Sequence, residues 1–401
     1  MTRPDFDQTP DFDRIIDRIG TNCSKWDDMQ AAYGVAPGDG GLAMWVADMD
    51  FRPPAAVQRA VESAAAHGVY GYPGAHRPYL EAIAWWMQHR HGWQIDTDWI
   101  LTCSGLVNGT AMALQACSAP GDGIILFSPV YHAFGRVIRA SGREVVELPL
   151  AQQDGQYRLD WDNWDQRLTG REKMLILCSP HNPGGRVWSE DELNQIADFC
   201  VSRDLVLVSD DIHCDLVLPG SPRHRMIDGM RPDLRPRLIT LSAATKTFNI
   251  AGAHLGNAII ADPALRSRFR NVLAANGISP GMMGQDMVAA AYSPEGAAWV
   301  DALVEYLDGN RRIFDQGVNA IAGVRSMPLQ ATYLSWVDFS GTGMAPAEFT
   351  ARVEREARIA ANHGASFGTG GENFLRFNIA TPRARVIEAV ARLQAAFADL
   401  Q

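Results

Sequence analysis

Short apolar runs alternate with helical patterns through the middle of the chain. Four such runs are rich in aliphatic residues and end at a turn or a polar residue; they cover residues 124–127, 174–178, 205–208 and 238–241. Runs of this kind are typical of buried strands. Because they are apolar on both faces, we expect helices to cover both sides of a mostly parallel sheet, which is an α/β fold.

Helical patterns lie between and after these strands. Ser189 and Glu192 form a capping-box pattern, which predicts that a helix starts directly after residue 189. The last twenty residues are also predicted to be helical. Five residues are expected on the apolar face of this last helix: Val386, Ile387, Val390, Leu393 and Phe397. The pattern of elements changes near residues 290–294, after which a smaller α+β domain is expected.

Composition and charge narrow the class of protein. The 401 residues include 36 Lys and Arg against 46 Asp and Glu, so the formal net charge is −10. Hydrophobic residues make up 47% and charged residues 20%, which fits a folded protein. A negative surface argues against non-specific binding of nucleic acid and against anchoring to an anionic membrane. One helix N-terminus or one arginine can still bind a single anion.

Targeting signals and metal-binding motifs are not seen in the sequence. The first eighteen residues are acidic and lack the basic start and apolar run of a signal peptide, and no apolar stretch approaches the ~20 residues that span a bilayer. We therefore expect a cytoplasmic protein with reduced cysteines. The six cysteines are scattered without a CxxC pair, so no metal site is expected.

A polar or aromatic residue follows each of four strand ends. In chain order these residues are Tyr131, Asn182, Asp210 and Lys246. Ligands of open α/β sheets bind beyond the carboxyl ends of the strands, so the four side chains are expected to share one edge. Taken singly, each has an ordinary interpretation: packing for the tyrosine, a turn for Asn-Pro-Gly-Gly, a helix cap for the aspartate and solvation for the lysine.

Taken together, the four residues match the needs of one cofactor. Pyridoxal 5′-phosphate (PLP) needs a lysine to form a Schiff base and an acidic partner for its pyridinium nitrogen. Lys246 and Asp210 are of the right type for these two roles. An amide such as Asn182 can orient the ring through its hydroxyl, and an aromatic side chain such as Tyr131 can pack on the ring face. The sequence therefore predicts a PLP site.

The chain also resembles a known family over nearly its whole length. The order and spacing of NPGG (182–185), SDDIH (209–213) and TKTFNIAG (245–252) resemble those of fold-type I enzymes of the class I/II aminotransferase family. Within that family the chain is most similar to the cystathionine β-lyase, or C–S lyase, branch. The segments that carry this narrower likeness are MWVADMDF (44–51), YGYP (70–73), SPVYHAF (128–134), SDDIHCDL (209–216), KTFNIAG (246–252) and FLRFNIATPR (374–383).

The resemblance implies a fold and a domain division. It implies a large PLP-binding domain over residues 56–290, with a mostly parallel, helix-covered sheet of the seven-stranded type. Residues 291–401 would form the C-terminal small domain. Residues 1–55 would form an N-terminal arm and part of the small domain.

The resemblance also implies roles by position. Lys246 would be the Schiff-base lysine and Asp210 the pyridinium partner, while Asn182 would contact the ring hydroxyl and Tyr131 would stack on the ring. His213 falls where aminotransferases usually have a tyrosine and the lyase branch has histidine. A buried core histidine is the alternative interpretation of His213.

The phosphate group would sit at the start of a helix, near the backbone amides of Leu106 and Val107. Two departures from the family pattern affect this part of the site. His254 stands where aminotransferases commonly have a phosphate-binding arginine, and Ala243 stands where they often have serine. Of the hydroxyls that remain nearby, Thr245 is expected to bind the cofactor.

The substrate side of the site is also implied by the resemblance. Arg376 would bind the substrate carboxylate in a bidentate manner, and the backbone around Ala47 and Asp48 would line the same pocket. A surface arginine is the alternative for Arg376, but its apolar neighbours predict a buried strand, where an unpaired guanidinium is costly. Tyr72 would reach the cofactor phosphate of the other subunit, which implies a homodimer with shared active sites.

Several other residues near the motifs have ordinary interpretations. Tyr333 and Trp336 match a strand of the family but are expected to pack the small domain. Cys103, Cys178 and Cys214 are expected to be small buried residues and not catalytic thiols. Asp211 stands where the lyase branch usually has glutamate.

These features predict a PLP-dependent carbon–sulfur β-lyase that acts on an L-amino acid such as cystathionine or another cysteine S-conjugate. The products would be a thiol, pyruvate and ammonia. An aminotransferase that uses the same residues with a 2-oxo acid is the alternative. A PLP-binding regulatory protein with little turnover is a third hypothesis. The residues do not define the side-chain specificity.

Overall fold

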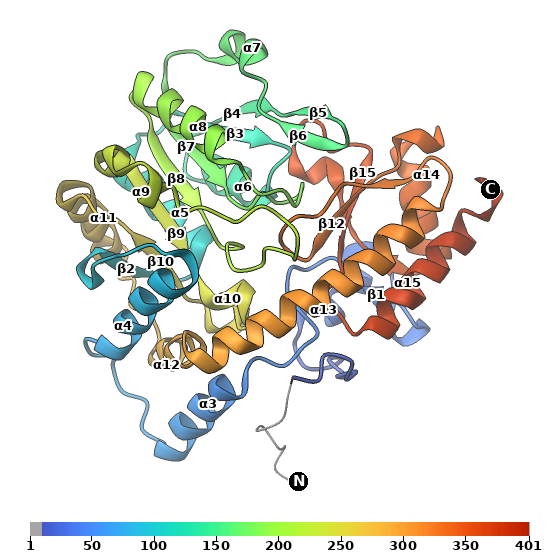
Figure 1. The fold of residues 1–401 in the computed structure, drawn as a ribbon, viewed down its shortest axis with the longest axis horizontal. Coiled ribbons are helices and arrows are strands. Elements are labelled where there is room, and N and C mark those ends of the chain that lie inside the picture. The colour runs from blue at the N-terminus through green and yellow to red at the C-terminus, as the bar shows by residue number, and fades with distance from the viewer. Residues whose placement is uncertain (1–9, 401) are drawn as a thin grey trace.

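The computed structural model describes residues 10–400, and its centre is a seven-stranded sheet (Figure 1). The strands lie in the order β2 (Ile100–Cys103), β10 (Gly256–Ile259), β9 (Leu238–Ser242), β8 (Val206–Asp210), β7 (Glu172–Cys178), β3 (Gly123–Ser128) and β4 (Glu144–Pro149). Adjacent strands are parallel except at β10, which is antiparallel to both of its neighbours. The expected fold class and the four predicted strands, now β3, β7, β8 and β9, are confirmed.

Helices cover both faces of this sheet. Alternate residues of the central strands pack against α5 (Leu106–Cys117), α6 (His132–Ala140) and α11 (Pro263–Ala275) on one face, and against α8 (Glu190–Ser202) on the other. The strand residues on the first face are Ile124, Leu126, Met174, Ile176, Val208, Ile239 and Leu241, and those on the second are Ile125, Phe127, Leu175, Leu177, Leu207 and Leu238. Burial on both faces explains why these strands are almost continuously apolar.

The two predicted helices are present, with one correction. Ser189 caps α8, and the reciprocal bonds of the capping box with Glu192 are both formed. The C-terminal helix α15 (Arg383–Ala396) buries Val386 and Leu393, but Ile387 is 52% exposed. The prediction that Ile387 shares the apolar face is therefore wrong, because one residue turns a helix by about 100° and carries this side chain toward solvent.

A smaller antiparallel sheet lies in the C-terminal part of the chain. Its strand order is β11 (Arg325–Ser326), β12 (Leu334–Asp338), β15 (Phe374–Asn378) and β14 (Asn362–His363). Near the N-terminus, β1 (Leu42–Ala43) pairs in parallel with β13 (Ile359–Ala360). The N-terminal segment therefore joins the C-terminal part, while the limits 1–55, 56–290 and 291–401 remain predictions.

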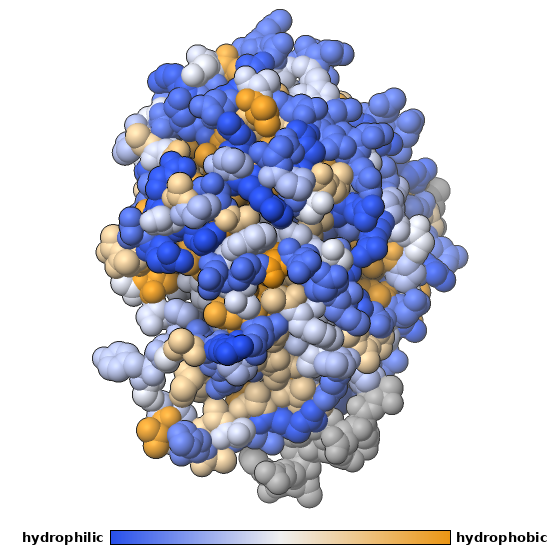
Figure 2. Space-filling view, turned by 60° about the vertical axis from the view of Figure 1, so that its left-hand side comes forward, coloured by the Kyte–Doolittle hydropathy of each residue, from blue (hydrophilic) through white to orange (hydrophobic). Residues whose placement is uncertain are grey.

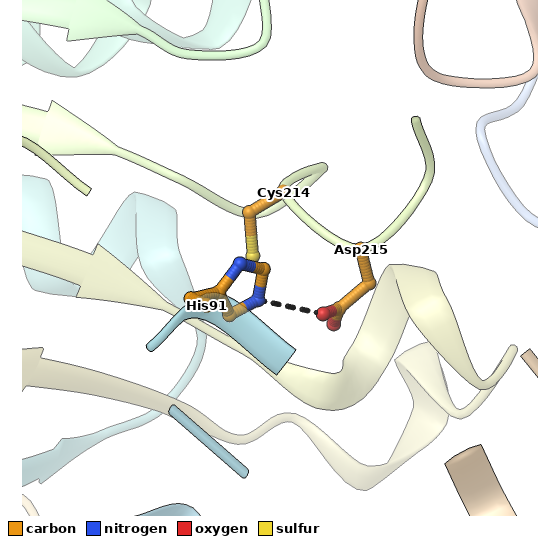
Figure 3. Close-up of side chains that lie close together, drawn as sticks. All are labelled: His91, Cys214 and Asp215. Carbon is orange, nitrogen blue, oxygen red and sulfur yellow. Dashed lines mark hydrogen bonds and ion pairs between the residues drawn. The ribbon is translucent and has the colours of Figure 1, made fainter. Parts of the chain in front are cut away.

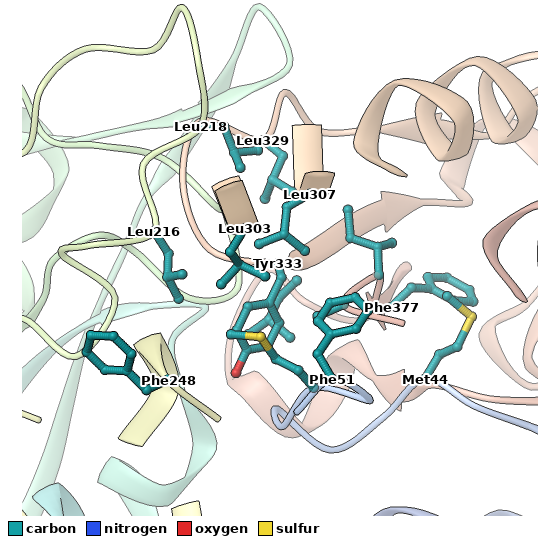
Figure 4. Close-up of a cluster of buried hydrophobic side chains, with 14 of the residues drawn as sticks. Met44, Phe51, Leu216, Leu218, Phe248, Leu303, Leu307, Leu329, Tyr333 and Phe377 are labelled. Atoms are coloured by element: carbon teal, nitrogen blue, oxygen red, sulfur yellow. The ribbon is translucent and has the colours of Figure 1, made fainter. Parts of the chain in front are cut away.

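A buried apolar cluster connects segments that are far apart in the sequence (Figure 4). Leu303 and Leu307 belong to the long helix α13 (Pro294–Asn319), which follows α12 (Met282–Ala291) and crosses the front of the molecule in Figure 1. Other labelled members come from the N-terminal, central and C-terminal segments: Met44, Phe51, Leu216, Leu218, Phe248, Leu329, Tyr333 and Phe377. This core holds residues 44–51 close to the segments that follow β8 and β9.

Polar residues cover much of the face drawn in Figure 2, and moderately apolar residues gather in its lower part, over the region of α3 (Ala55–His67), α4 (Arg77–Trp86) and α12. Among the described residues, no helix is both long enough and apolar enough to cross a membrane.

Candidate active site

The four predicted polar residues meet at one edge of the central sheet. Asp210 is the last residue of β8, and Lys246 lies in α10 (Ala244–Thr247), which follows β9. Tyr131 and Asn182 follow β3 and β7, and the backbone N–H of Tyr131 donates to the Asn182 carbonyl at 3.0 Å. Because these strands are neighbours and parallel, their carboxyl ends carry all four residues to the same side.

Lys246 is a buried lysine with unusual surroundings. Its Nζ donates to the Ala47 carbonyl at 2.6 Å, and within residues 10–400 no carboxylate lies within ion-pair distance of it. Burial lowers the pKa of Lys246 to about 8, with Asp48 and Asp210 opposing this effect and Arg376 adding to it. The other two lysines of the sequence differ from Lys246: Lys25 is buried but pairs with Asp50 at 3.0 Å, and Lys173 is exposed.

Asp210 is a buried carboxylate that has no cationic partner in the described chain. Its Oδ1 accepts one bond, from the backbone N–H of Ile212 at 3.2 Å. Burial, to which the neighbouring Asp211 adds, raises the pKa of Asp210 to about 7. Asp211 itself pairs with His224 at 2.9 Å. A cation held against Asp210, such as a protonated ring nitrogen, would relieve the cost of burying this charge.

Arg376 lies in the middle of β15 and is 2% exposed. Its donors reach neutral acceptors: Nη1 donates to Asn182 Oδ1 at 3.0 Å, and Nη2 donates to Asn362 Oδ1 at 2.6 Å and to the Trp45 carbonyl at 2.9 Å. Nε has no partner among the described residues. Burial lowers the pKa of Arg376 to about 10. A buried guanidinium without a carboxylate partner is suited to bind the carboxylate of a ligand.

Asn182 and Tyr131 flank this arginine. Because Asn182 Oδ1 accepts from Arg376, its Nδ2 remains as a donor with no partner in the described chain. That donor is of the kind needed for a ring hydroxyl. The ring of Tyr131 packs edge-on against Phe134 with centroids 5.5 Å apart, and burial raises the pKa of its hydroxyl.

His213 is buried, and its Nδ1 has no hydrogen-bond partner in the described part of the chain. Burial lowers the pKa of His213 to about 3, an effect to which Lys246 and Arg376 add, so the ring is neutral at pH 7. A histidine that serves only the core would be expected to have its ring nitrogens satisfied. The unpartnered nitrogen therefore favours the cofactor-contact interpretation of His213.

The segment around Ala47 and Asp48 forms one wall of the site. The Ala47 carbonyl accepts from both Lys246 Nζ and the Tyr333 hydroxyl, the latter at 2.9 Å. Asp48 pairs with Arg18 at 2.6 Å, and Asn378 Nδ2 donates to the carbonyls of Val46 and Asp48. These bonds hold the backbone of residues 46–48 against Lys246.

Three residues of this wall were not assigned to the site from the sequence. Tyr333 was expected to pack the small domain, yet its hydroxyl shares a carbonyl with Lys246. Asn362 and Asn378 bind Arg376 and the 46–48 backbone. Asn378 belongs to the family motif FLRFNIATPR, and this membership was the sequence signal that could have assigned it to the site. By contrast, Trp336 packs as expected, stacked on Phe374 with centroids 4.8 Å apart.

The predicted phosphate site is at the start of α5. Leu106 and Val107 are its first two residues, and the first helical bond runs from Gly109 to Gly105, so the earlier amides point outward as free donors. Gly256 abuts this helix start, because a Cβ at Gly256 would lie 3.2 Å from Gly105 Cα. Thr245 is buried in α10, whereas His254 is exposed.

Tyr72 is the one predicted site residue that this chain does not bring to its own site. Its side chain is fully exposed, between α3 and α4. The remaining cofactor-binding residues fit PLP: a lysine with a lowered pKa, a buried acid, an amide donor, an aromatic ring and a helix N-terminus with free amides. The fold and this site together define a PLP-dependent enzyme of fold type I.

Comparisons with known proteins agree with that class. A sequence profile for aminotransferase class I and II matches residues 46–393, and the chain belongs to this family. It is 35% identical over 388 residues to cystathionine beta-lyase PatB of Bacillus subtilis (strain 168), across 96% of this chain and 99% of that protein.

Two solved structures are also closely similar. Cystalysin from Treponema denticola, which contains a pyridoxal 5′-phosphate cofactor, has a TM-score of 0.92 at 33% identity, covering 98% of this chain and 100% of that one. The PLP-bound C–S lyase from Staphylococcus hominis has a TM-score of 0.87 at 28% identity, covering 98% of this chain and 99% of that one.

Proposed function

We propose that the protein is a PLP-dependent carbon–sulfur β-lyase of the cystathionine β-lyase type. It would convert L-cystathionine, or a related cysteine S-conjugate, to a thiol, pyruvate and ammonia. The observation that carries this proposal is the buried, neutral His213, which stands where aminotransferases usually have tyrosine and whose Nδ1 has no hydrogen-bond partner among the described residues. The similarity to cystathionine beta-lyase PatB, to cystalysin and to the C–S lyase from Staphylococcus hominis supports the same activity.

Arg376 binds the α-carboxylate of the substrate in this proposal. Its guanidinium is held by Asn182, Asn362 and the Trp45 carbonyl, so the ligand meets a fork that is already oriented. A preoriented arginine loses less side-chain entropy on binding than a mobile one. This contact places the substrate Cα on the side of the site where Lys246 lies.

Lys246 is the proton-transfer group. When bound, PLP supplies an electron-accepting ring that stabilises negative charge at the substrate Cα. Asp210, which is buried, would hold the proton on the ring nitrogen. Because the pKa of Lys246 is about 8, roughly a tenth of its free amine is unprotonated at pH 7, far more than for an ordinary lysine.

The reaction then follows from the Cα proton. Lys246 Nζ removes this proton, and the Cβ–S bond breaks with its electron pair leaving on sulfur as a thiolate. The nitrogen-containing three-carbon fragment takes up water and yields pyruvate and ammonia. His213, being neutral and beside Lys246, adds no second cation near the departing proton.

We also infer that the enzyme is a homodimer with shared active sites. Large apolar side chains are exposed in and beside α3, α4 and α12, where the surface of Figure 2 is less polar: Val69, Tyr70, Tyr72, Trp85 and Met283. A second copy of the chain seated there would bury these residues, and Tyr72 would then reach the partner's cofactor phosphate.

A substrate screen tests the proposed function. Pyruvate and thiol are measured after addition of L-cystathionine, L-cystine, L-cysteine and L-alanine to the purified holoenzyme. Release of pyruvate from L-cystathionine is expected, with none from L-alanine. Rapid amino transfer to a 2-oxo acid without pyruvate release would instead show an aminotransferase. Bound PLP with negligible turnover in both assays would favour a regulatory role.

A further inference from the structure

A buried polar cluster contacts α10, the helix that carries Lys246, through Thr247. His91, Cys214 and Asp215 bring three potential metal-ligand atoms within 4.8 Å of one another (Figure 3). The Asp215 oxygens, however, already accept hydrogen bonds, so they are not free ligands. Burial raises the pKa of the Cys214 thiol well above its ordinary value, so the sulfur is not a thiolate. The cluster is therefore a hydrogen-bond network.

Asp215 is the centre of this network and uses both of its carboxylate oxygens. Oδ1 accepts from Trp86 Nε1 at 3.0 Å and from His91 Nε2 at 2.8 Å, and Oδ2 accepts from the Thr247 hydroxyl at 2.8 Å. His224, paired with Asp211, faces His91 with ring centroids 6.1 Å apart. A buried carboxylate with three donors is fully satisfied and rigid.

Three segments of the chain converge on Asp215. Trp86 ends α4 and His91 ends the π-helical turn that follows it. Asp215 itself belongs to the loop after β8, which also carries His213 and starts directly after Asp210, the last residue of the strand. Thr247 is the last residue of α10 and the immediate neighbour of Lys246.

The helix that carries Lys246 depends on such contacts for its position. Helix α10 has four residues, and its N-cap residue, Ala243, makes no side-chain capping bond. A single helical turn has little stability of its own, so tertiary bonds decide where it lies. The Thr247–Asp215 bond joins α10 directly to the loop that follows Asp210.

We infer that Asp215 is a positioning residue, which fixes Lys246 relative to Asp210 through the Thr247 hydroxyl. The inference rests on the proposed use of Lys246 as the cofactor-linked base. Thr247→Val removes the hydroxyl in an almost isosteric side chain, and Thr247→Ser keeps the hydroxyl. Asp215→Asn replaces a three-fold acceptor with a group that must itself donate. A displacement of about 1 Å at a reacting group lowers rates up to about 100-fold.

Asp228→Asn is the matched control. Asp228 is also buried and accepts from an indole N–H, that of Trp93, at 2.8 Å, and from Arg235 at 3.0 Å. It belongs to α9 (Ile227–Met230) and makes no hydrogen bond with a residue of the proposed site. Any loss caused by disturbing a buried carboxylate in general will appear in this variant too.

Three quantities are measured on each holo-protein: the unfolding temperature, kcat and KM for the thioether substrate, and the rate at which borohydride fixes PLP to Lys246, followed by peptide mass. We expect Thr247→Val and Asp215→Asn to lower kcat at least about 10-fold with KM within about 2-fold, and to change the fixation rate. Thr247→Ser, which keeps the hydroxyl, should retain most of the native kcat. Asp228→Asn should lower the unfolding temperature without changing kcat, KM or the fixation rate.

Two results would overturn the inference. One is a loss of kcat in Thr247→Ser as large as in Thr247→Val. The other is an unchanged kcat and fixation rate in both Thr247→Val and Asp215→Asn. If Thr247→Val does not fold, the comparison of kcat and fixation rate between Asp215→Asn and Asp228→Asn tests the inference. If the native enzyme releases no pyruvate from any sulfur-containing substrate of the screen, the proposed function fails, while the fixation rate still tests Asp215.

Discussion

Arg376 donates a hydrogen bond from Nη1 to Asn182 Oδ1 across 3.0 Å, although 194 positions separate the two residues in the sequence. Arg376 comes from the small antiparallel sheet and Asn182 from the segment that follows β7 of the large sheet. This bond therefore joins the group assigned to the substrate carboxylate to the group assigned to the cofactor ring. A change at either residue is expected to affect the other.

Arg376→Lys is expected to raise KM for amino-acid substrates by roughly 10- to 100-fold, which corresponds to one lost hydrogen bond to a charged group. Lysine keeps the charge but cannot hold Asn182, Asn362 and a carboxylate at once. Steady-state kinetics with L-cystathionine measure the effect. Arg352→Lys, which alters a surface ion pair with Asp399, is the control and should leave KM unchanged. An unchanged KM in Arg376→Lys would show that the carboxylate binds elsewhere.

Asp210→Asn should change how the stability of the cofactor-free protein depends on pH. The pKa of Asp210 is about 7 in the folded state and near 3.8 in the unfolded state. Between pH 3.8 and pH 7 the folded protein therefore holds a proton on Asp210 that the unfolded protein has released. Stability from this group is present below pH 4 and is lost as the pH rises toward 7.

Relative to the native protein, Asp210→Asn should therefore gain about 3 kcal/mol in its free energy of unfolding between pH 4 and pH 7. Urea unfolding at a series of pH values measures this difference. The exposed Asp162→Asn should show no such trend. A difference that stays flat across this range would contradict a raised pKa at Asp210.

Tyr72 and Lys246 should complement each other across a dimer. Lys246→Ala and Tyr72→Ala are each expected to abolish most pyruvate release when alone. When the two variants are mixed and allowed to exchange subunits, half of the dimers carry one chain of each kind, and each of these has one intact site. Activity should then recover to about a quarter of the native value.

The control for this experiment mixes Lys246→Ala with the double variant that carries both changes. That mixture contains no intact site under any arrangement, so it should stay inactive. No recovery in the first mixture, with exchange shown by mass, would mean that Tyr72 serves its own chain or no site at all.

The buried cysteines should be inert to alkylation at neutral pH. Burial raises the pKa of Cys103 to about 12 and raises those of Cys178 and Cys214 as well. Iodoacetamide should therefore label the half-buried Cys23 while pyruvate release stays within about 2-fold of the untreated rate. Cys23→Ser should remove the label. Inactivation that coincides with labelling of Cys178 or Cys214 would show that a thiol takes part.

The sequence by itself determined four neighbouring strands of the seven-stranded central sheet. Runs such as 124–127 and 174–178 become strands because their residues are apolar on both faces and are bounded by turn residues. The capping box at Ser189 and Glu192 is likewise a local arrangement. Parallel strands in adjacent positions carry the residues at their carboxyl ends together, so Asp210 and Lys246 could be brought to one site before any contact was known.

Tertiary structure alone decided the remainder of the site. Tyr333 shares the Ala47 carbonyl with Lys246, and Asn378 holds the 46–48 backbone, across separations of 286 and about 330 positions. Such contacts depend on how the small sheet and the N-terminal segment pack against the large sheet, which local propensity does not encode. The same holds for Ile387, whose exposure is decided by how α15 packs on its neighbours, and for Tyr72, whose side chain is fully exposed in this chain.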